Sequence, residues 1–241
     1  MSDYRVVTIS NRKPTQDYYT YDQLFKSVGS HEILVLGQQR GEYTGLSDKP
    51  RILYNAIKNN LIKEDIIFFV DAWDVVFASS LDEVYEKFKT FRCPIVIGAE
   101  KNCFPPNFKK EYDKLPSFSS YKYLNSGVII GYKDAIMEVL EAMDAPNLPQ
   151  DYRNNITQTN YHFNDQAYYM DLFLRQPVEM RLDYTCFIAQ NLQDVTEDEL
   201  GFSEHRIINN ETKSYPSIFH WNGSSKDKWS REPILKHLNL L

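Results

Sequence analysis

Two aspartates, Asp71 and Asp74, follow directly after the apolar run Ile-Ile-Phe-Phe-Val at residues 66–70. Five apolar residues with a β-branched bias predict a strand that is buried on both faces, as strands are inside a parallel sheet. An acidic pair at the carboxyl end of such a strand is costly unless something positive lies against it, and open α/β sheets bind their ligands at that edge. The stretch therefore predicts either a divalent-metal site of the Asp-x-x-Asp kind that holds a nucleotide diphosphate, or a turn with two solvated carboxylates.

His220, far downstream, is the candidate that completes such a metal site. It lies in the segment Ile-Phe-His-Trp-Asn-Gly at residues 218–223, which we expect to be a strand that ends in a polar loop. Mg²⁺ and Mn²⁺ prefer near-octahedral oxygen ligation, and Mn²⁺ also accepts an imidazole nitrogen. A lone histidine is more often a hydrogen-bonded residue near a sheet edge, but its place at a strand end, with Lys226 six residues later, favours a ligand.

Two lysines and a tryptophan could bind the rest of a nucleotide. Lys226 and Lys49 are candidates to neutralise the part of a diphosphate that the metal does not cover, although most lysines are solvated surface groups. Trp73 stands between the two aspartates and could stack on a planar base, with an ordinary core tryptophan as the alternative.

The triplet Asn164-Asp165-Gln166 opens a segment with helical spacing of apolar residues. Asn164 is the expected N-cap, and Asp165 falls in the first turn, where a carboxylate is favoured. The triplet could place a carboxylate over a sugar or an acceptor hydroxyl, or it could simply start a helix. The long stretch 101–123, with Cys103-Phe104-Pro105 near its start, is expected to be a lid or binding loop.

The elements that would position these residues alternate between strands and helices. We expect strands over residues 6–9, 32–36, 66–70, 95–99, 128–131 and 178–182 and from residue 218, and helices over residues 21–28, about 49–62, from a capping box at 79–83, about 133–143 and from 164. This order predicts one α/β domain over residues 1–241, with a Rossmann-like, mostly parallel sheet flanked by helices.

Composition excludes several classes of protein. The chain has 241 residues and a net charge of −6, which argues against general nucleic-acid binding because that requires a basic face. No apolar run approaches the roughly 18–20 residues needed to span a bilayer, and the N-terminal residues lack the apolar region of a signal peptide. Three cysteines without metal-ligand spacing indicate reduced thiols. We therefore expect a cytoplasmic protein without a membrane span.

Six segments also match one known pattern, in order and over nearly the whole chain. They are Phe-Val-Asp-Ala-Trp-Asp-Val at 69–75, Gly-Ala-Glu with Cys-Phe-Pro at 98–105, Tyr-Leu-Asn-Ser-Gly-Val-Ile-Ile-Gly at 123–131, Asn-Asp-Gln-Ala-Tyr-Tyr at 164–169, Leu-Asp-Tyr-Thr-Cys-Phe-Ile-Ala-Gln-Asn-Leu at 182–192 and His-Trp-Asn-Gly-Ser-Ser-Lys at 220–226. The chain resembles the glycosyltransferase domain of multifunctional procollagen lysyl hydroxylases. Since it ends soon after the last segment, we expect a free-standing transferase.

This resemblance implies a GT-A glycosyltransferase fold, Mn²⁺ with Mg²⁺ as the alternative, a UDP-glucose or UDP-galactose donor, and free or glycosylated hydroxylysine of a collagen-like protein as acceptor. A homodimer could form as well. The residue roles implied are metal ligation by Asp71, Asp74 and His220, uracil stacking by Trp73, a place by the uridine for Thr8, diphosphate binding by Gly223 and Lys226, and a sugar and acceptor pocket lined by Asn125, Asp165 and Gln166. Lys49, selected above for its charge, and Asn222, which precedes Gly223, are further candidates for binding the donor.

The sequence departs from the family pattern at two positions within the matching segments. Asn164 stands where the family has an aspartate, without the acidic run that precedes it there, and Phe104 replaces a tryptophan. These differences bear on acceptor and donor-sugar preference. Two alternatives therefore stay open: the same UDP-sugar chemistry on a glycan, lipid or modified-DNA hydroxyl, and an inactive transferase fold that acts as a scaffold.

Overall fold

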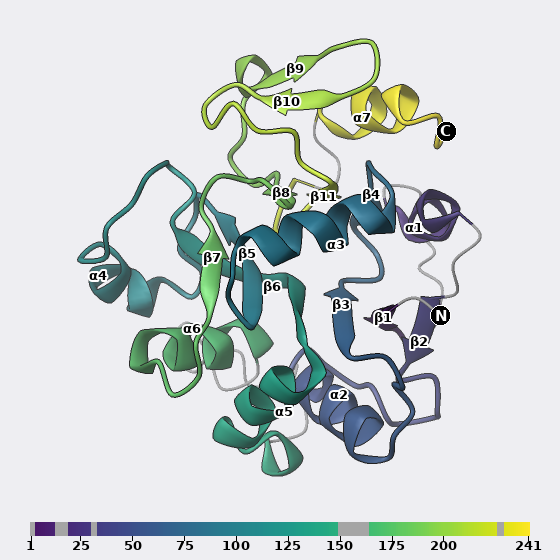
Figure 1. Cartoon of the computed structure of the whole chain (residues 1–241), viewed down its shortest axis with the longest axis vertical. Helices are drawn as coiled ribbons and strands as arrows, with labels where there is room; N and C mark the ends of the chain where they lie inside the picture. Colours follow the sequence, from purple (N-terminus) through teal and green to yellow (C-terminus); the bar gives the residue numbers. More distant parts are fainter. Residues whose placement is uncertain (1–2, 13–18, 30–32, 149–163, 226–228) are drawn as a thin grey trace.

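Strand β3, Ile66–Val70, is fully buried and lies inside a six-stranded sheet ordered β2-β1-β3-β6-β5-β7 (Figure 1). The computed structural model describes residues 3–12, 19–29, 33–148, 164–225 and 229–241. The other strands of this sheet are β1 (Tyr4–Ile9), β2 (Ile33–Leu36), β5 (Ile95–Glu100), β6 (Tyr123–Tyr132) and β7 (Arg181–Asp183). Within this sheet β6 alone runs against the other strands. The expected mostly parallel α/β sheet is confirmed.

Helices cover both faces of the sheet, because successive side chains of a strand point to opposite sides. Ile67 and Phe69 belong to one hydrophobic cluster, and Phe68 and Val70 belong to a second. The first cluster includes apolar residues of α2 (Asp48–Lys58), α5 (Lys133–Ala142) and α6 (Asp165–Arg175), which lie in the lower half of Figure 1. The second includes those of α1 (Tyr21–Val28) and α3 (Leu81–Thr90). Helices on both faces of the sheet thus explain why β3 is apolar at every position.

Strand β6 differs from the expected parallel strand over 128–131. It begins at Tyr123 and pairs antiparallel with both β3 and β5. A parallel connection needs a crossover of a dozen or more residues, usually a helix that packs on the sheet. The segment between β5 and β6 contains only a 3₁₀ turn, Pro106–Phe108, and the single helical turn α4, Lys109–Tyr112. The chain therefore returns beside β5 in the opposite direction.

A second sheet of three short strands was not expected from the sequence. It has the order β4-β11-β8, with β4 at Val75–Phe77, β11 at Ile218–His220 and β8 at Ala189–Asn191. Strand β11 pairs antiparallel with β4 and parallel with β8. In Figure 1 this sheet lies above the strand ends of the main sheet. Three-residue strands are too short to show a periodicity, which is why only the start of β11 was predicted.

The remaining boundaries agree with the sequence to within a few residues. The helix expected over about 49–62 ends at Lys58, and the strand expected over 178–182 is β7, which starts only at Arg181. Further along lie a hairpin of β9 (Leu200–Phe202) and β10 (Ile207–Asn209) and the helix α7 (Arg231–His237). In the part of the chain that is described, no helix combines the length and apolar character that crossing a membrane requires.

Candidate active site

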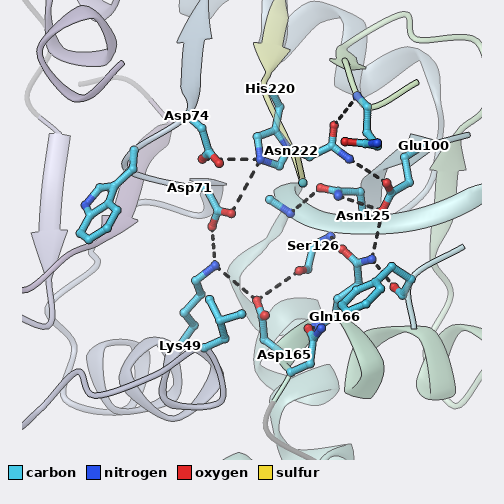
Figure 2. A pocket seen from close by; sticks show the side chains of 18 of the residues that line it. Lys49, Asp71, Asp74, Glu100, Asn125, Ser126, Asp165, Gln166, His220 and Asn222 are labelled. Atoms are coloured by element: carbon cyan, nitrogen blue, oxygen red, sulfur yellow. Dashed lines mark hydrogen bonds and ion pairs between the residues drawn. The ribbon is translucent and has the colours of Figure 1, made fainter. Parts of the chain in front are cut away.

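The two aspartates and the histidine meet at the junction of the two sheets. Asp71 follows β3, Asp74 precedes β4 and His220 ends β11. Because β4 and β11 pair with His220 opposite Val75, and the amide of Trp221 donates to the carbonyl of Asp74, His220 is held beside the acidic turn. The three side chains offer ligand atoms within 4.8 Å of one another (Figure 2).

The donor set fits a divalent cation. Nε2 of His220 lies 3.8 Å from an oxygen of Asp71 and 3.6 Å from an oxygen of Asp74. His220 is 2 % exposed, and Asp74 is also buried. The two carboxylates suit Mn²⁺ or Mg²⁺ in charge and ligand type, and the imidazole nitrogen favours Mn²⁺ of the two. These three residues are the ones that would hold the ion.

Lys49 connects this cluster to Asp165. Its Nζ lies 2.6 Å from an oxygen of Asp71 and 3.5 Å from an oxygen of Asp165, whose carboxylate also accepts from the hydroxyl of Ser126. Burial alone would lower the pKa of Lys49, but the charges of Asp165 and Asp71 outweigh it and hold the pKa well above its ordinary value. Lys49 is therefore a fixed cation among carboxylates. This placement favours a role in holding Asp71 and Asp165 in position, and direct contact with a diphosphate stays a prediction.

A buried carboxylate, Glu100, forms the opposite wall. One of its oxygens accepts from the side-chain amides of Asn125 and Gln166, both at 3.0 Å, and the other accepts from Asn222 at 2.7 Å. Burial raises the pKa of Glu100 to about 7, against the effect of these three donors. Glu100 thus fixes the orientation of three amides that the sequence assigned to the donor and acceptor pocket.

Trp73 is half-buried in the wall of the cavity that these residues line. Its indole nitrogen donates to the hydroxyl of Ser10 at 2.9 Å, and the ring of Tyr19 meets it edge-on with 5.1 Å between centroids. The indole is therefore held in place, as a stacking surface requires.

The Thr8 side chain does not line this cavity. The side chain is fully buried and donates to the carbonyl of Val70 at 2.7 Å, and Thr8 is absent from the described residues that line the cavity. Thr8 sits inside a central strand, β1, and its hydroxyl ties that strand to the end of β3. The Thr8 side chain therefore supports the end of β3, and a place for this residue by the uridine stays a prediction.

The cavity that the candidate site residues line has a volume of about 530 Å³. Its lining includes, of the residues selected from the sequence, Lys49, Asp71, Trp73, Asp74, Asn125, Asp165, Gln166, His220, Asn222 and Gly223. Lys226 lies outside the described residues. Phe104, half exposed, lines the cavity as expected for a lid residue, and its carbonyl accepts from Gln166. A volume of this size suits a ligand larger than a single sugar.

Three further residues of this site were not expected from the sequence. Glu100 ends a strand and lies in one of the six matching segments, so its position was a usable signal. Ser126 donates to Asp165 and follows Asn125 directly. Gln193 accepts from the amide of Ser224 at 2.8 Å and lines the cavity beside Gly223. Nothing in the local sequence around Gln193 indicates that β8 and β11 would bring these two loops together.

The fold agrees with that of glycosyltransferases. A glycosyltransferase involved in the glycosylation of the major capsid of PBCV-1 matches with a TM-score of 0.51 over 99 % of both chains, at 14 % identity. Mouse xyloside xylosyltransferase 1, in its apo form, matches with a TM-score of 0.55 over 92 % of this chain and 98 % of that one, at 12 % identity. The likeness establishes a GT-A glycosyltransferase fold.

The family follows from the sequence. A family model described as the PLOD GT domain matches residues 2–231. The chain belongs to this family and is a glycosyltransferase of the PLOD GT domain type.

The curated relatives are longer than this chain. Procollagen-lysine,2-oxoglutarate 5-dioxygenase of Drosophila melanogaster is 28 % identical over 242 residues, which cover 92 % of this chain and 31 % of that protein. Procollagen-lysine,2-oxoglutarate 5-dioxygenase 1 of Homo sapiens is 31 % identical over 199 residues, covering 78 % and 25 %. The uncharacterized protein R699 of Acanthamoeba polyphaga mimivirus is 29 % identical over 179 residues, covering 73 % and 34 %. The chain thus spans a quarter to a third of their lengths.

Proposed function

We propose that this chain transfers a hexose from a UDP-sugar to hydroxylysine or galactosylhydroxylysine of a collagen-like protein, with Mn²⁺ bound and Mg²⁺ as the alternative. Glucose is the favoured hexose and galactose the second candidate. The observation that carries the donor half is that Asp71, Asp74 and His220 face the same cavity as the Glu100 wall and Trp73. The acceptor half is supported by the relatives, whose names refer to procollagen lysine.

In this scheme the protein acts through placement and charge. A bound divalent ion would neutralise the diphosphate of the leaving UDP. Lys49 holds Asp71 in place through its 2.6 Å contact. Trp73 offers its ring to the base, and the amides held by Glu100 orient hydroxyl groups of the sugar and the acceptor. Holding both reactants in one buried site lowers the entropic part of the barrier, and fixed charges stabilise the charge that develops on the leaving group.

The decisive experiment measures UDP release with Mn²⁺ from a panel of UDP-sugars, each with a hydroxylysine peptide, its galactosylated form and a matched lysine peptide. We expect Asp71→Asn and Asp74→Asn each to lower UDP release by about 100-fold or more, since each removes charge at the leaving group. Asp134→Asn makes the same chemical change on an exposed residue of α5 outside the cavity lining and should leave the rate unchanged.

The outcomes separate the parts of the proposal. Full activity of Asp71→Asn would contradict the metal-dependent scheme. UDP release that hydroxylysine peptides do not stimulate, but another hydroxyl compound does, would overturn the acceptor and leave the donor site standing.

A further inference from the structure

Asn191, which does not line the cavity, contacts the histidine of the candidate metal site. It ends β8, is fully buried and lies directly opposite His220 in the parallel pairing of β8 with β11. Neighbouring residues in paired strands point to the same face of a sheet. The Oδ1 of Asn191 accordingly lies 2.7 Å from Nδ1 of His220.

The second contact of Asn191 determines which way its amide faces. Its Nδ2 donates to the backbone carbonyl of Ala99 at 2.8 Å. Reversing the amide would put its oxygen against that carbonyl oxygen, two acceptors with no proton between them. The nitrogen must therefore face Ala99, and the oxygen must face His220.

This orientation decides the protonation of the neutral imidazole. An amide oxygen can only accept, so the ring nitrogen that it faces, Nδ1, must carry the hydrogen. The other nitrogen, Nε2, then presents its lone pair, and this is the atom that lies 3.6–3.8 Å from the carboxylates of Asp74 and Asp71. Without an acceptor at Nδ1 the hydrogen would move to Nε2, where those carboxylates would accept it.

We infer that Asn191 is a positioning residue. Its amide, oriented by the backbone carbonyl of Ala99 in β5, holds His220 in the Nδ1–H tautomer and so keeps Nε2 available for a divalent cation. Asn191 meets β5 where the pairing of that strand with β6 shifts register, between Ile97 and Ala99. This inference rests on the proposed metal site for its consequence, but the tautomer itself is a property of the metal-free protein. Outer partners of ligating histidines typically change metal affinity by about 10–100-fold when they are removed.

The test uses two variants of Asn191 and two measurements. Asn191→Leu has similar size and makes neither hydrogen bond, whereas Asn191→Asp keeps an acceptor for Nδ1–H and loses only the amide donor to Ala99. The first measurement is the ¹⁵N spectrum of the histidine rings in the metal-free protein at a pH where the rings are neutral, with the His220 signals identified by their loss in His220→Gln. The second is Mn²⁺ affinity by electron paramagnetic resonance of the free ion. Neither depends on turnover.

We expect the Nδ1–H form in the wild type and in Asn191→Asp, with Mn²⁺ affinities that differ by no more than a few-fold. Asn191→Leu should shift His220 to the Nε2–H form and weaken Mn²⁺ binding by about 10–100-fold. Asn209→Leu is the matched control, because Asn209 is also fully buried and donates to Tyr121 and Gln190, away from the cavity lining. It should lose stability without changing either measurement.

An Nε2–H ring in the wild type would overturn the inference directly, whether or not a variant folds. The inference also fails if Asn191→Leu keeps the Nδ1–H form or binds Mn²⁺ as tightly as the wild type. If Asn191→Leu and Asn191→Asp weaken Mn²⁺ binding equally and leave the tautomer of His220 unchanged, Asn191 has a packing role instead. A wild type that shows the Nδ1–H form but binds no Mn²⁺ would overturn the proposed metal site while leaving the effect of Asn191 on the ring to be decided by the spectra.

Discussion

Glu100 brings an ionisable carboxyl group into a wall where only 3 % of the residue is exposed. Losing water favours the neutral acid, whereas the amides of Asn125, Gln166 and Asn222 favour the carboxylate. Burial is the larger effect, so the pKa of Glu100 rises to about 7. The residue thus changes charge near neutral pH in the metal-free protein, next to the amides that are expected to orient the substrates.

This raised pKa makes folding stability depend on pH. Between about pH 4.5 and 7 the unfolded chain releases the proton of Glu100 while the folded chain keeps it, so the free energy of unfolding should fall as pH rises through this window. Glu100→Gln cannot titrate. We compare the free energies of unfolding of wild type and Glu100→Gln in urea without metal. Relative to the variant, the value for the wild type should fall as pH rises from 4.5 to 7, and the difference should then stay constant. A difference that is the same at every pH would show that Glu100 titrates normally.

At the scale of elements, the close approach of β6 to β11 restricts the position of His220, the histidine of the candidate metal site. A Cβ atom built on Gly127 would lie 2.1 Å from Cε1 of His220, and the carbonyl of Gly127 accepts from the amide of Asp71 at 2.9 Å. Any side chain at this point of β6 would need the space that the imidazole occupies. Gly127 therefore has a packing role at the junction of the two sheets.

Gly127→Ala should consequently displace His220 and weaken Mn²⁺ binding by about 10-fold or more, because an added methyl in a close-packed site forces a shift of side chain or backbone. Gly131→Ala is the control on the same strand, since its Cβ would lie 2.9 Å from the carbonyl oxygen of Pro94, far along β6 from His220. Both variants should lower the melting temperature, but only Gly127→Ala should change metal affinity. Equal affinities in calorimetric titrations of the two variants would contradict this role.

At the scale of the whole molecule, the site joins parts of the chain that are far apart in sequence. Asp71 and Asp74 belong to the turn between β3 and β4, whereas His220 arrives through β11 from near the end of the chain. Glu100, Asn125 and Asn222 likewise come from β5, from β6 and from the loop after β11. A ligand that contacts these groups together can bind only the folded chain.

Mn²⁺ should therefore stabilise the whole fold by mass action. At a concentration 100 times the dissociation constant, a ligand that binds only the native state adds about 2.7 kcal/mol, which corresponds to roughly 5–10 °C in melting temperature for a chain of this size. We expect this shift in thermal unfolding of the wild type and its absence in His220→Gln. The same shift in both proteins would place the bound ion elsewhere.

Much of the fold could be predicted because its signals are local. The apolar run at β3, the helical spacing of α2 and the cap at Asn164, whose side chain accepts from the amide of Gln166, are each set by neighbours in sequence. The direction of β6 and the sheet β4-β11-β8 were not predictable in this way, because pairing between strands depends on contacts across the chain. The residues of the candidate metal site were selected from their types and positions. Asn191 was not selected, although it lies in the matching segment at 182–192, because residue type does not show that its side chain meets His220.

The sequence by itself determined an α/β fold, the position of the acidic pair after a buried strand, and a family resemblance that placed His220 beside it. Only the tertiary structure decided that Lys49 pairs with Asp71 and Asp165, that the Thr8 hydroxyl bonds the end of β3, and that Glu100 and Asn191 orient the amides and the histidine of the site. The physical reason is that residue type specifies what a group can donate, accept or ligate. Which partner it meets, and how little water reaches it, follows from the packing of strands that are distant in sequence.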